Sequence, residues 1–269
     1  METSNWLYLV LELGSEGDMY EYIAKNGALG ETRSKDVFAQ LVCALTYCHK
    51  HRVAHRDLKP ENVVICVDKL NDEQIVKVTD FGLSNSFHDS TMMETFCGSM
   101  AYSSPEVLLR EPYDGPMSDI WSLGIILYMM VCKDHPFRQA NEHETIIRVM
   151  DVKYEFPDGI GADFCDLVQM MLKKEPKERA TLEEIKDHPW MITATGESLV
   201  DIWNERDKTA ENATAAETPV PGIATKLTKS EHTWVVSEME KVRGPWPLVW
   251  LGFADRGRGT RHRSWCVCV

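Results

Sequence analysis

Residues 54–65 read "AHRDLKPENVVI" and place several polar side chains directly ahead of an apolar, strand-like run. Asp57, Lys59 and Asn62 stand on one predicted loop, and Asp80 follows the hairpin predicted after it. Because a hairpin returns the chain to its starting point, we expect Asp80 to face the same cleft as this loop.

These four side chains together suit the movement of a phosphoryl group between oxygens. A carboxylate such as Asp57 can orient a hydroxyl group and accept its proton, and Lys59 can neutralise a phosphate. The amide oxygen of Asn62 and the carboxylate of Asp80 are hard ligands of the kind that Mg²⁺ prefers. Each residue alone is more commonly a turn residue or a solvated charge, so the interpretation depends on the combination.

Hydrophobic spacing around this stretch predicts a mainly α-helical body with one short β-hairpin. The predicted elements are a strand at 7–13, a helix at 36–50, hairpin strands at 63–66 and 75–79, and a helix at 164–174.

Polar residues predict where three further helices begin. The predicted starts are Ser104 followed by Pro105, Asn141 with Glu144, and Thr181 with Glu184. The apolar run "IWSLGIILYMMVC" at 120–132 has 13 residues, which is short for a membrane span and typical of a buried core helix.

Composition narrows the partners and the compartment. The 269 residues include 29 Lys and Arg against 42 Asp and Glu, a formal net charge of −13, which disfavours nucleic acid and favours basic peptides as partners. The eight cysteines match no zinc-site spacing, and the N-terminal apolar run carries Glu12, unlike a signal peptide. We therefore expect a reduced protein of the cytoplasm or nucleus with no membrane partner.

Three motifs in order resemble those of the protein kinases. "HRDLKPEN" resembles the kinase catalytic loop, "DFG" at 80–82 resembles the Mg²⁺-binding motif, and "SPE" at 104–106 stands where kinases carry Ala-Pro-Glu. Three such motifs within about fifty residues form a highly specific combination, so accidental motifs in an unrelated helical protein are the least favoured explanation. The resemblance covers residues 5–192.

The lysine in "DLKPEN" is similar to the serine/threonine branch of the family. Three segments resemble the sequences of the SNF-related kinases of the AMP-activated-kinase-like group: "LYLVLELGSEGDMYEYI", "TFCGSMAYSSPE" and "FRQANEHETI". The resemblance implies a kinase large lobe at 15–192, preceded by a remnant of the small-lobe strand and hinge at 1–14. Residues 193–269 match nothing recognised, show little periodicity and are predicted to be a disordered tail.

The resemblance also implies a role for individual residues, with ATP and Mg²⁺ as cofactors. Asp57 resembles the catalytic base, Lys59 the neutraliser of the γ-phosphate, and Asn62 and Asp80 the Mg²⁺ ligands. The residues implied around the nucleotide are Leu11 as gatekeeper, Glu12 and Gly14 at the adenine edge, Asp18 at the ribose and Val64 under the ring. Glu61 is implied nearby, and it resembles the acid that favours a basic residue in the substrate peptide.

Regulation and architecture are implied in the same way. Thr95 resembles the activating threonine of this group, phosphorylated by an upstream kinase, and Arg56 resembles the arginine that pairs with that phosphate. Three other residues resemble architectural ones, namely Glu106 paired with Arg179, and Asp119 anchoring the backbone of the catalytic loop.

The sequence as given shows five residues ahead of Trp6, and these include no glycine-rich loop or strand lysine. We therefore expect this chain to be a truncated kinase with little activity as written, since losing one charge-stabilising donor lowers rates by about 10²–10³. The alternative is a catalytically inactive kinase lobe that acts as a binding or docking module. Phosphoryl transfer that depends on Asp57 distinguishes the two.

Overall fold

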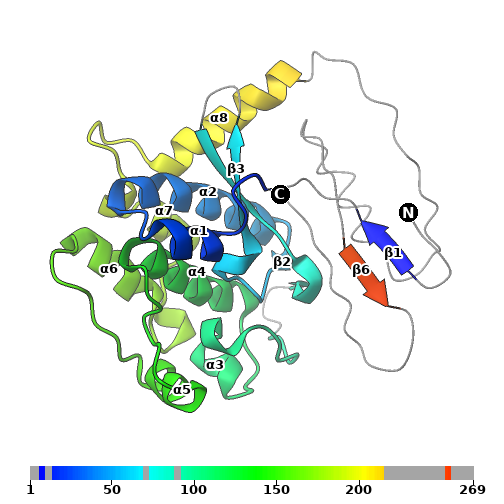
Figure 1. The fold of residues 1–269 in the computed structure, drawn as a ribbon, viewed down its shortest axis with the longest axis vertical. Helices are drawn as coiled ribbons and strands as arrows, with labels where there is room; N and C mark the ends of the chain where they lie inside the picture. The colour runs from blue at the N-terminus through cyan, green and yellow to red at the C-terminus, as the bar shows by residue number, and fades with distance from the viewer. Residues whose placement is uncertain (1–5, 10–13, 69–72, 88–91, 215–251, 256–269) are drawn as a thin grey trace.

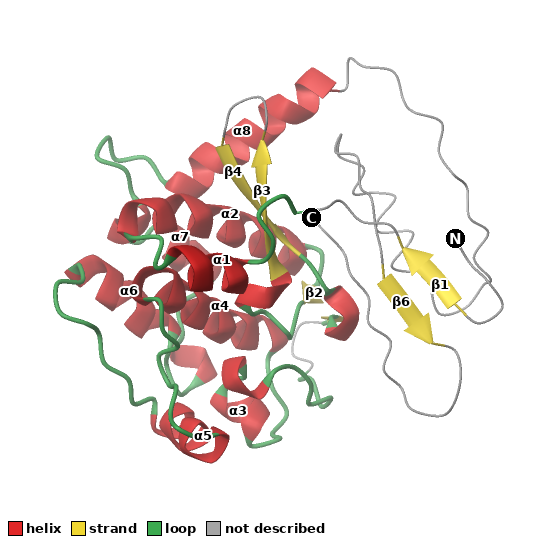
Figure 2. Ribbon diagram, viewed as in Figure 1, coloured by secondary structure: helices red, strands yellow, loops and turns green. Residues whose placement is uncertain are grey.

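The computed structural model describes residues 6–9, 14–68, 73–87, 92–214 and 252–255. Helices form most of this part of the chain, and the strands pair in twos (Figures 1 and 2). The α-helices are α1 (Met19–Asn26), α2 (Glu31–Lys50), α3 (Pro105–Leu108), α4 (Gly115–Cys132), α5 (Glu142–Asp151), α6 (Ala162–Met171), α7 (Leu182–Lys186) and α8 (Leu199–Thr214).

Six strands form three antiparallel pairs. They are β1 (Trp6–Leu9) with β6 (Gly252–Asp255), β2 (Val53–Ala54) with β5 (Asn85–Ser86), and β3 (Val63–Asp68) with β4 (Glu73–Val78). Short 3₁₀ helices connect these elements: η1 (Pro60–Asn62), η2 (Phe81–Leu83), η3 (Met100–Tyr102), η4 (Pro176–Glu178) and η5 (Pro189–Met191).

The central helix α4 forms much of the hydrophobic core. Asp114 begins it by accepting a hydrogen bond from the amide of Met117 at 3.2 Å, and Pro116 occupies the first turn. It is long and apolar enough to cross a membrane, but 83% of it is buried inside the described part of the protein. That burial agrees with the core helix predicted at 120–132.

The β3–β4 hairpin packs against α2 (Figure 1). Gln40 of α2 accepts a hydrogen bond from the Val76 amide at 2.9 Å and donates to the Gln74 carbonyl at 3.1 Å. A single side chain thus satisfies two backbone groups on the open edge of β4. This contact fixes the hairpin that carries the predicted metal ligands at its base.

The predicted helix starts hold to different degrees. Thr181 and Glu184 form a reciprocal capping box, and the Asn141 side chain accepts from the Glu144 amide at 2.9 Å. Ser104 lies at the start of α3 but makes no capping hydrogen bond, because its hydroxyl instead lies 3.1 Å from the Ser118 hydroxyl of α4. The predicted helix start is therefore confirmed, with Ser104 at the N-cap and Pro105 in the first turn, but without a side-chain capping hydrogen bond.

The first part of the tail predicted to be disordered is helical. Helix α8 occupies residues 199–214 and packs against α2, with Val200 buried and the Cys43 thiol donating to the Val200 carbonyl at 3.5 Å. The sequence predicted disorder from residue 193, because the stretch is rich in Thr, Ala and Glu and its apolar residues show little helical period along most of its length. Residues 215–251 and 256–269 lie outside the described residues, so the prediction for them stays a prediction.

Candidate active site

The predicted catalytic loop is anchored by α4. The Asp119 carboxylate, 1% exposed, accepts hydrogen bonds from the backbone amides of His55 at 2.9 Å and Arg56 at 2.8 Å. His49 lies 2.9 Å from the same carboxylate. Arg56 takes a left-handed backbone conformation (φ 67°), which these bonds hold in place. Asp119 thus makes the backbone contact predicted for it.

His55 joins the loop to the segment that carries Asp80. Its Nε2 lies 3.0 Å from the Thr79 carbonyl, its Nδ1 lies 3.3 Å from the Asp57 amide, and its ring packs edge-on against Phe81. Complete burial lowers the pKa of His55, so the ring is neutral, donates through Nε2 and accepts through Nδ1. Sequence reasoning quoted this residue but assigned it no role.

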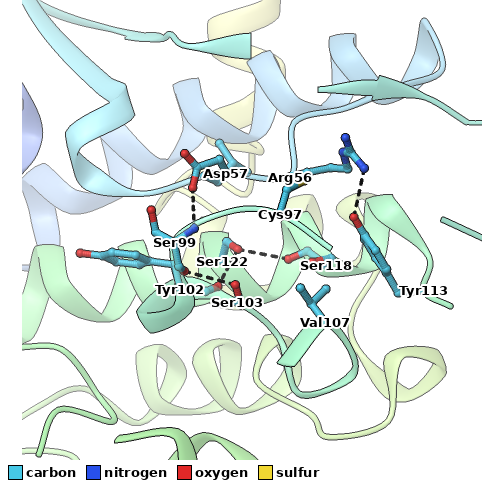
Figure 3. Close-up of a pocket in the computed structure, with 11 residues that line it drawn as sticks. Arg56, Asp57, Cys97, Ser99, Tyr102, Ser103, Val107, Tyr113, Ser118 and Ser122 are labelled. Atoms are coloured by element: carbon cyan, nitrogen blue, oxygen red, sulfur yellow. Dashed lines mark hydrogen bonds between the residues drawn. The ribbon is translucent and has the colours of Figure 1, made fainter. Parts of the chain in front are cut away.

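Asp57 is held in place from two sides. Lys59 Nζ lies 3.0 Å from Asp57 Oδ2, and the backbone amide of Ser99 donates to Asp57 Oδ1 at 2.8 Å (Figure 3). Lys59 also donates to the Ser99 hydroxyl at 2.8 Å. The sequence predicted no role for Ser99, which lies within the stretch "TFCGSMAYSSPE". Asp57 therefore has a defined orientation beside a cation.

The hairpin brings Asn62 and Asp80 together at its base, next to the catalytic loop. The β3–β4 register opposes Val63 to Val78, and the Thr79 amide donates to the Asn62 carbonyl at 2.9 Å, so Asp80 follows directly. Asp57 and Asp80 both act electrostatically on the His55 ring that lies among them. The Asn62 amide nitrogen lies 3.4 Å from Asp57 Oδ2, so the side chains at 57 and 62 are in contact, and Asp80 lies close enough to act on the same histidine.

Asn62 and Asp80 fit the chemistry of a magnesium site. The Asn62 amide nitrogen donates to the Asp57 carbonyl at 2.8 Å, which leaves the amide oxygen as the available ligand. Asp80 has a left-handed backbone (φ 60°) and one carboxylate oxygen accepts from the Gly82 amide at 3.2 Å. No cluster of three or more His, Cys, Asp or Glu ligands occurs in the described ranges.

Of the predicted nucleotide residues, Val64 lies on β3, and Gly14 and Asp18 lie against it. Gly14 packs so closely on Val64 that a Cβ added to it would lie 1.9 Å from Val64 Cγ1. Asp18 begins α1, where its carboxylate accepts from the Glu21 amide at 2.8 Å, a capping role that the sequence did not predict. Leu11 and Glu12 lie outside the described residues. The roles of this set toward a nucleotide stay predictions.

Glu61 lies on η1 with its side chain exposed, four residues after Asp57. Burial raises the pKa of the Tyr102 hydroxyl, and the charge of Glu61 raises it further. Tyr102 and Asp57 line the same small pocket (Figure 3), so the charge of Glu61 acts on a residue of that pocket.

The side chain of Arg56 points away from Asp57 and toward the predicted activation segment (Figure 3). Its guanidinium donates to the Leu83 carbonyl at 2.7 Å, the Thr95 carbonyl at 3.3 Å and the Tyr113 hydroxyl at 3.3 Å. Thr95 itself is exposed. The predicted partners Arg56 and Thr95 are therefore in contact through the backbone of Thr95.

The predicted architectural pair is present below the site. Arg179 donates two hydrogen bonds to the Glu106 carboxylate, at 2.8 and 2.6 Å, and both residues are buried. It also donates to the carbonyls of Met117, Lys173 and Lys174. This network ties the segment after "SPE" to the C-terminal half of the lobe.

Comparison with known proteins identifies the family. The protein kinase domain matches residues 1–191. This chain belongs to the protein kinase family. It is 51% identical over 192 residues to the SNF-related serine/threonine-protein kinase of Rattus norvegicus, and 50% identical to that of Homo sapiens. It is 37% identical over 196 residues to sperm motility kinase 3A of Mus musculus.

These matches confirm the predicted family, fold class and serine/threonine branch. Each SNF-related match covers 71% of this chain and 25% of the relative, so the chain spans about a quarter of the length of those kinases. The sperm motility kinase match covers 73% of this chain and 38% of the relative. Protein kinases as a family use ATP and Mg²⁺ and act on protein substrates.

Proposed function

We propose that this protein transfers the γ-phosphoryl group of ATP to serine or threonine hydroxyls of other proteins. The observation that carries the proposal is the fixed orientation of the Asp57 carboxylate. Lys59 and the Ser99 amide hold this carboxylate beside Asn62. Phosphoryl transfer depends mainly on positioning and on charge neutralisation, and these contacts supply both.

Each residue of the site has a distinct part in this reaction. The substrate hydroxyl oxygen forms a bond to the γ-phosphorus, the bond from that phosphorus to the bridging oxygen of ADP breaks, and the hydroxyl proton passes to Asp57. Lys59 neutralises charge on the transferred group. Asn62 and Asp80 would hold Mg²⁺, which when bound neutralises charge on the phosphates.

The nucleotide would lie over β3 in this proposal. Val64 forms the floor under the adenine ring, Gly14 and Glu12 meet its polar edge, Leu11 is the gatekeeper and Asp18 meets the ribose. The close packing of Gly14 on Val64 supports this assignment, because it puts the backbone at Gly14 directly beside the residue proposed as the floor.

Charge supports basic peptides as substrates. Glu61 is an exposed acid four residues from Asp57, and the chain carries a formal net charge of −13. Phosphorylation of the exposed Thr95 by an upstream kinase would add about 1.5 to 2 negative charges beside the Arg56 guanidinium. The six described cysteines are free thiols, which supports a reducing cytoplasmic or nuclear location that imaging of a tagged protein can test.

Phosphoryl transfer from Mg²⁺-ATP to a basic serine peptide tests the proposal. We expect transfer that is lost in Asp57→Asn and retained in the control Asp134→Asn, which changes an exposed acid of a surface ion pair. The measurement uses the full-length protein with Thr95 phosphorylated. Peptide binding without transfer, unchanged in Asp57→Asn, would instead establish the docking-module alternative.

A further inference from the structure

Tyr113 connects the catalytic loop to the activation segment. Its side chain is 1% exposed, and its hydroxyl donates to the Thr95 carbonyl at 3.0 Å while accepting from Arg56 at 3.3 Å. Arg56 also donates to the same Thr95 carbonyl at 3.3 Å. The three groups form a closed set of hydrogen bonds, which we call the Tyr113 clamp (Figure 3 shows its Arg56–Tyr113 bond).

The backbone beside the clamp is also fastened. Met93 donates to the Tyr113 carbonyl at 2.7 Å, and the Tyr113 amide donates back to the Met93 carbonyl at 3.0 Å. The Met93 and Tyr113 side chains pack with Ala54 and Val107 in a small apolar cluster apart from the main core. The ring of Tyr113 therefore has a packing role that is separate from the bonds of its hydroxyl.

The segment leads from the clamp directly to Asp57. Gly98 (φ 104°) runs so close to the catalytic loop that an added Cβ would lie 2.7 Å from the Arg56 carbonyl oxygen. The next residue, Ser99, donates its amide to Asp57 at 2.8 Å. Residues 93–99 are thus attached to Tyr113 at one end and to Asp57 at the other.

We propose that Tyr113 is a positioning residue that holds the activation segment on the catalytic loop without a phosphate on Thr95. The clamp uses the Thr95 carbonyl, while the exposed Thr95 side chain stays accessible for modification. A phosphate there and the Tyr113 hydroxyl would share the Arg56 guanidinium. The consequence for catalysis rests on the proposed kinase function, whereas the clamp itself does not.

Hydrogen–deuterium exchange on the full chain tests the clamp. Tyr113→Phe removes the hydroxyl and keeps the ring, so we expect amides in 93–99 to exchange about three- to tenfold faster, the effect of one lost hydrogen bond. The matched control is Tyr128→Phe, which removes a hydroxyl donating to the Glu155 carbonyl at 2.6 Å and should leave 93–99 unchanged. Unchanged exchange in Tyr113→Phe would overturn the clamp.

Two further measurements keep the proposal testable. If Tyr113→Phe does not fold, hydrogen–deuterium exchange on the unmodified chain tests the clamp instead. Exchange of the Met93 and Ser99 amides as fast as in an unfolded chain would rule the clamp out. In the full-length protein, the gain in activity on Thr95 phosphorylation should be larger in Tyr113→Phe, and an equal gain contradicts the positioning role. Faster exchange with no phosphoryl transfer in any form supports the clamp and rejects the proposed function instead.

Discussion

His135 links the segment after the activation loop to the core, and its bonds require a neutral ring. Its Nε2 lies 2.9 Å from the Ala101 carbonyl and its Nδ1 lies 3.2 Å from the Phe137 amide. Burial lowers the pKa of His135 to about 4, below the value of about 6.5 in an unfolded chain. The unfolded state therefore binds protons first as the pH falls.

This pKa difference predicts a pH dependence of stability. The contribution of His135 is fully present above about pH 6.5 and is lost as the pH falls toward 4, to a total of about 3 kcal/mol. We expect His135→Gln to reduce the slope of the unfolding free energy between pH 6.5 and 4, measured by denaturant titration. The control His51→Gln changes an exposed histidine, and an equal change in both variants would contradict the prediction.

The buried Glu106–Arg179 pair is expected to contribute strongly to the stability of the protein. Glu106→Ala leaves the Arg179 guanidinium buried without its carboxylate, so we expect a loss of about 3–5 kcal/mol in the free energy of unfolding. The matched control is Asp201→Ala, which breaks an exposed pair with Lys186 and should cost less than about 1 kcal/mol. Equal losses would mean that the buried network adds nothing beyond a surface pair.

Individual residues differ in how far the sequence predicted them. The motifs located Asp57, Asn62 and Asp80, because their chemistry is specific and their spacing is local. Ser99 and Tyr113 lie 42 and 56 positions after Asp57, and they act through a backbone amide and a buried hydroxyl. Such contacts leave no signature in composition, so they emerge only once the chain is folded.

The β3–β4 hairpin is the element on which the predicted metal ligands depend. Gln40 satisfies the Val76 amide and the Gln74 carbonyl on its open edge. Gln40→Ala leaves the buried Val76 amide without this partner, so we expect about 1–3 kcal/mol of destabilisation and faster exchange of the β4 amides. Arg33→Ala is the control, because it removes an exposed bond to the Gln74 side chain and a contact with the Tyr22 ring but no bond to the β4 backbone, and it should leave those amides unchanged.

Helices and strands were predicted correctly from the sequence where neighbouring residues determine them. The hairpin, the capping box at Thr181 and the core helix α4 follow from neighbouring residues alone. Ser104 stands at the predicted N-cap of α3, but its hydroxyl lies 3.1 Å from the Ser118 hydroxyl of α4, fourteen positions later, a contact that neighbouring residues do not predict. Helix α8 was missed because its few apolar residues acquire meaning only from their packing on α2.

At the scale of the whole molecule, the site is assembled from three separate parts. The catalytic loop supplies Asp57, the hairpin places Asp80, and the activation segment contributes Ser99. Asp119 of α4 holds the first of these from beneath. A loss of order in any one part would therefore change the position of Asp57, which is how the proposed phosphorylation of Thr95 would act on it at a distance.

Helix α8 extends this cooperative unit beyond the matched kinase domain. Val200, 2% exposed, packs on the core together with the partly buried Trp203. We expect Val200→Ala to lower the free energy of unfolding by about 1–3 kcal/mol and to speed exchange in both α2 and α8, because the two helices unfold together. Asn204→Ala, on the exposed side of the same helix, should change neither. Faster exchange in α8 alone would show that the helix opens independently of the lobe.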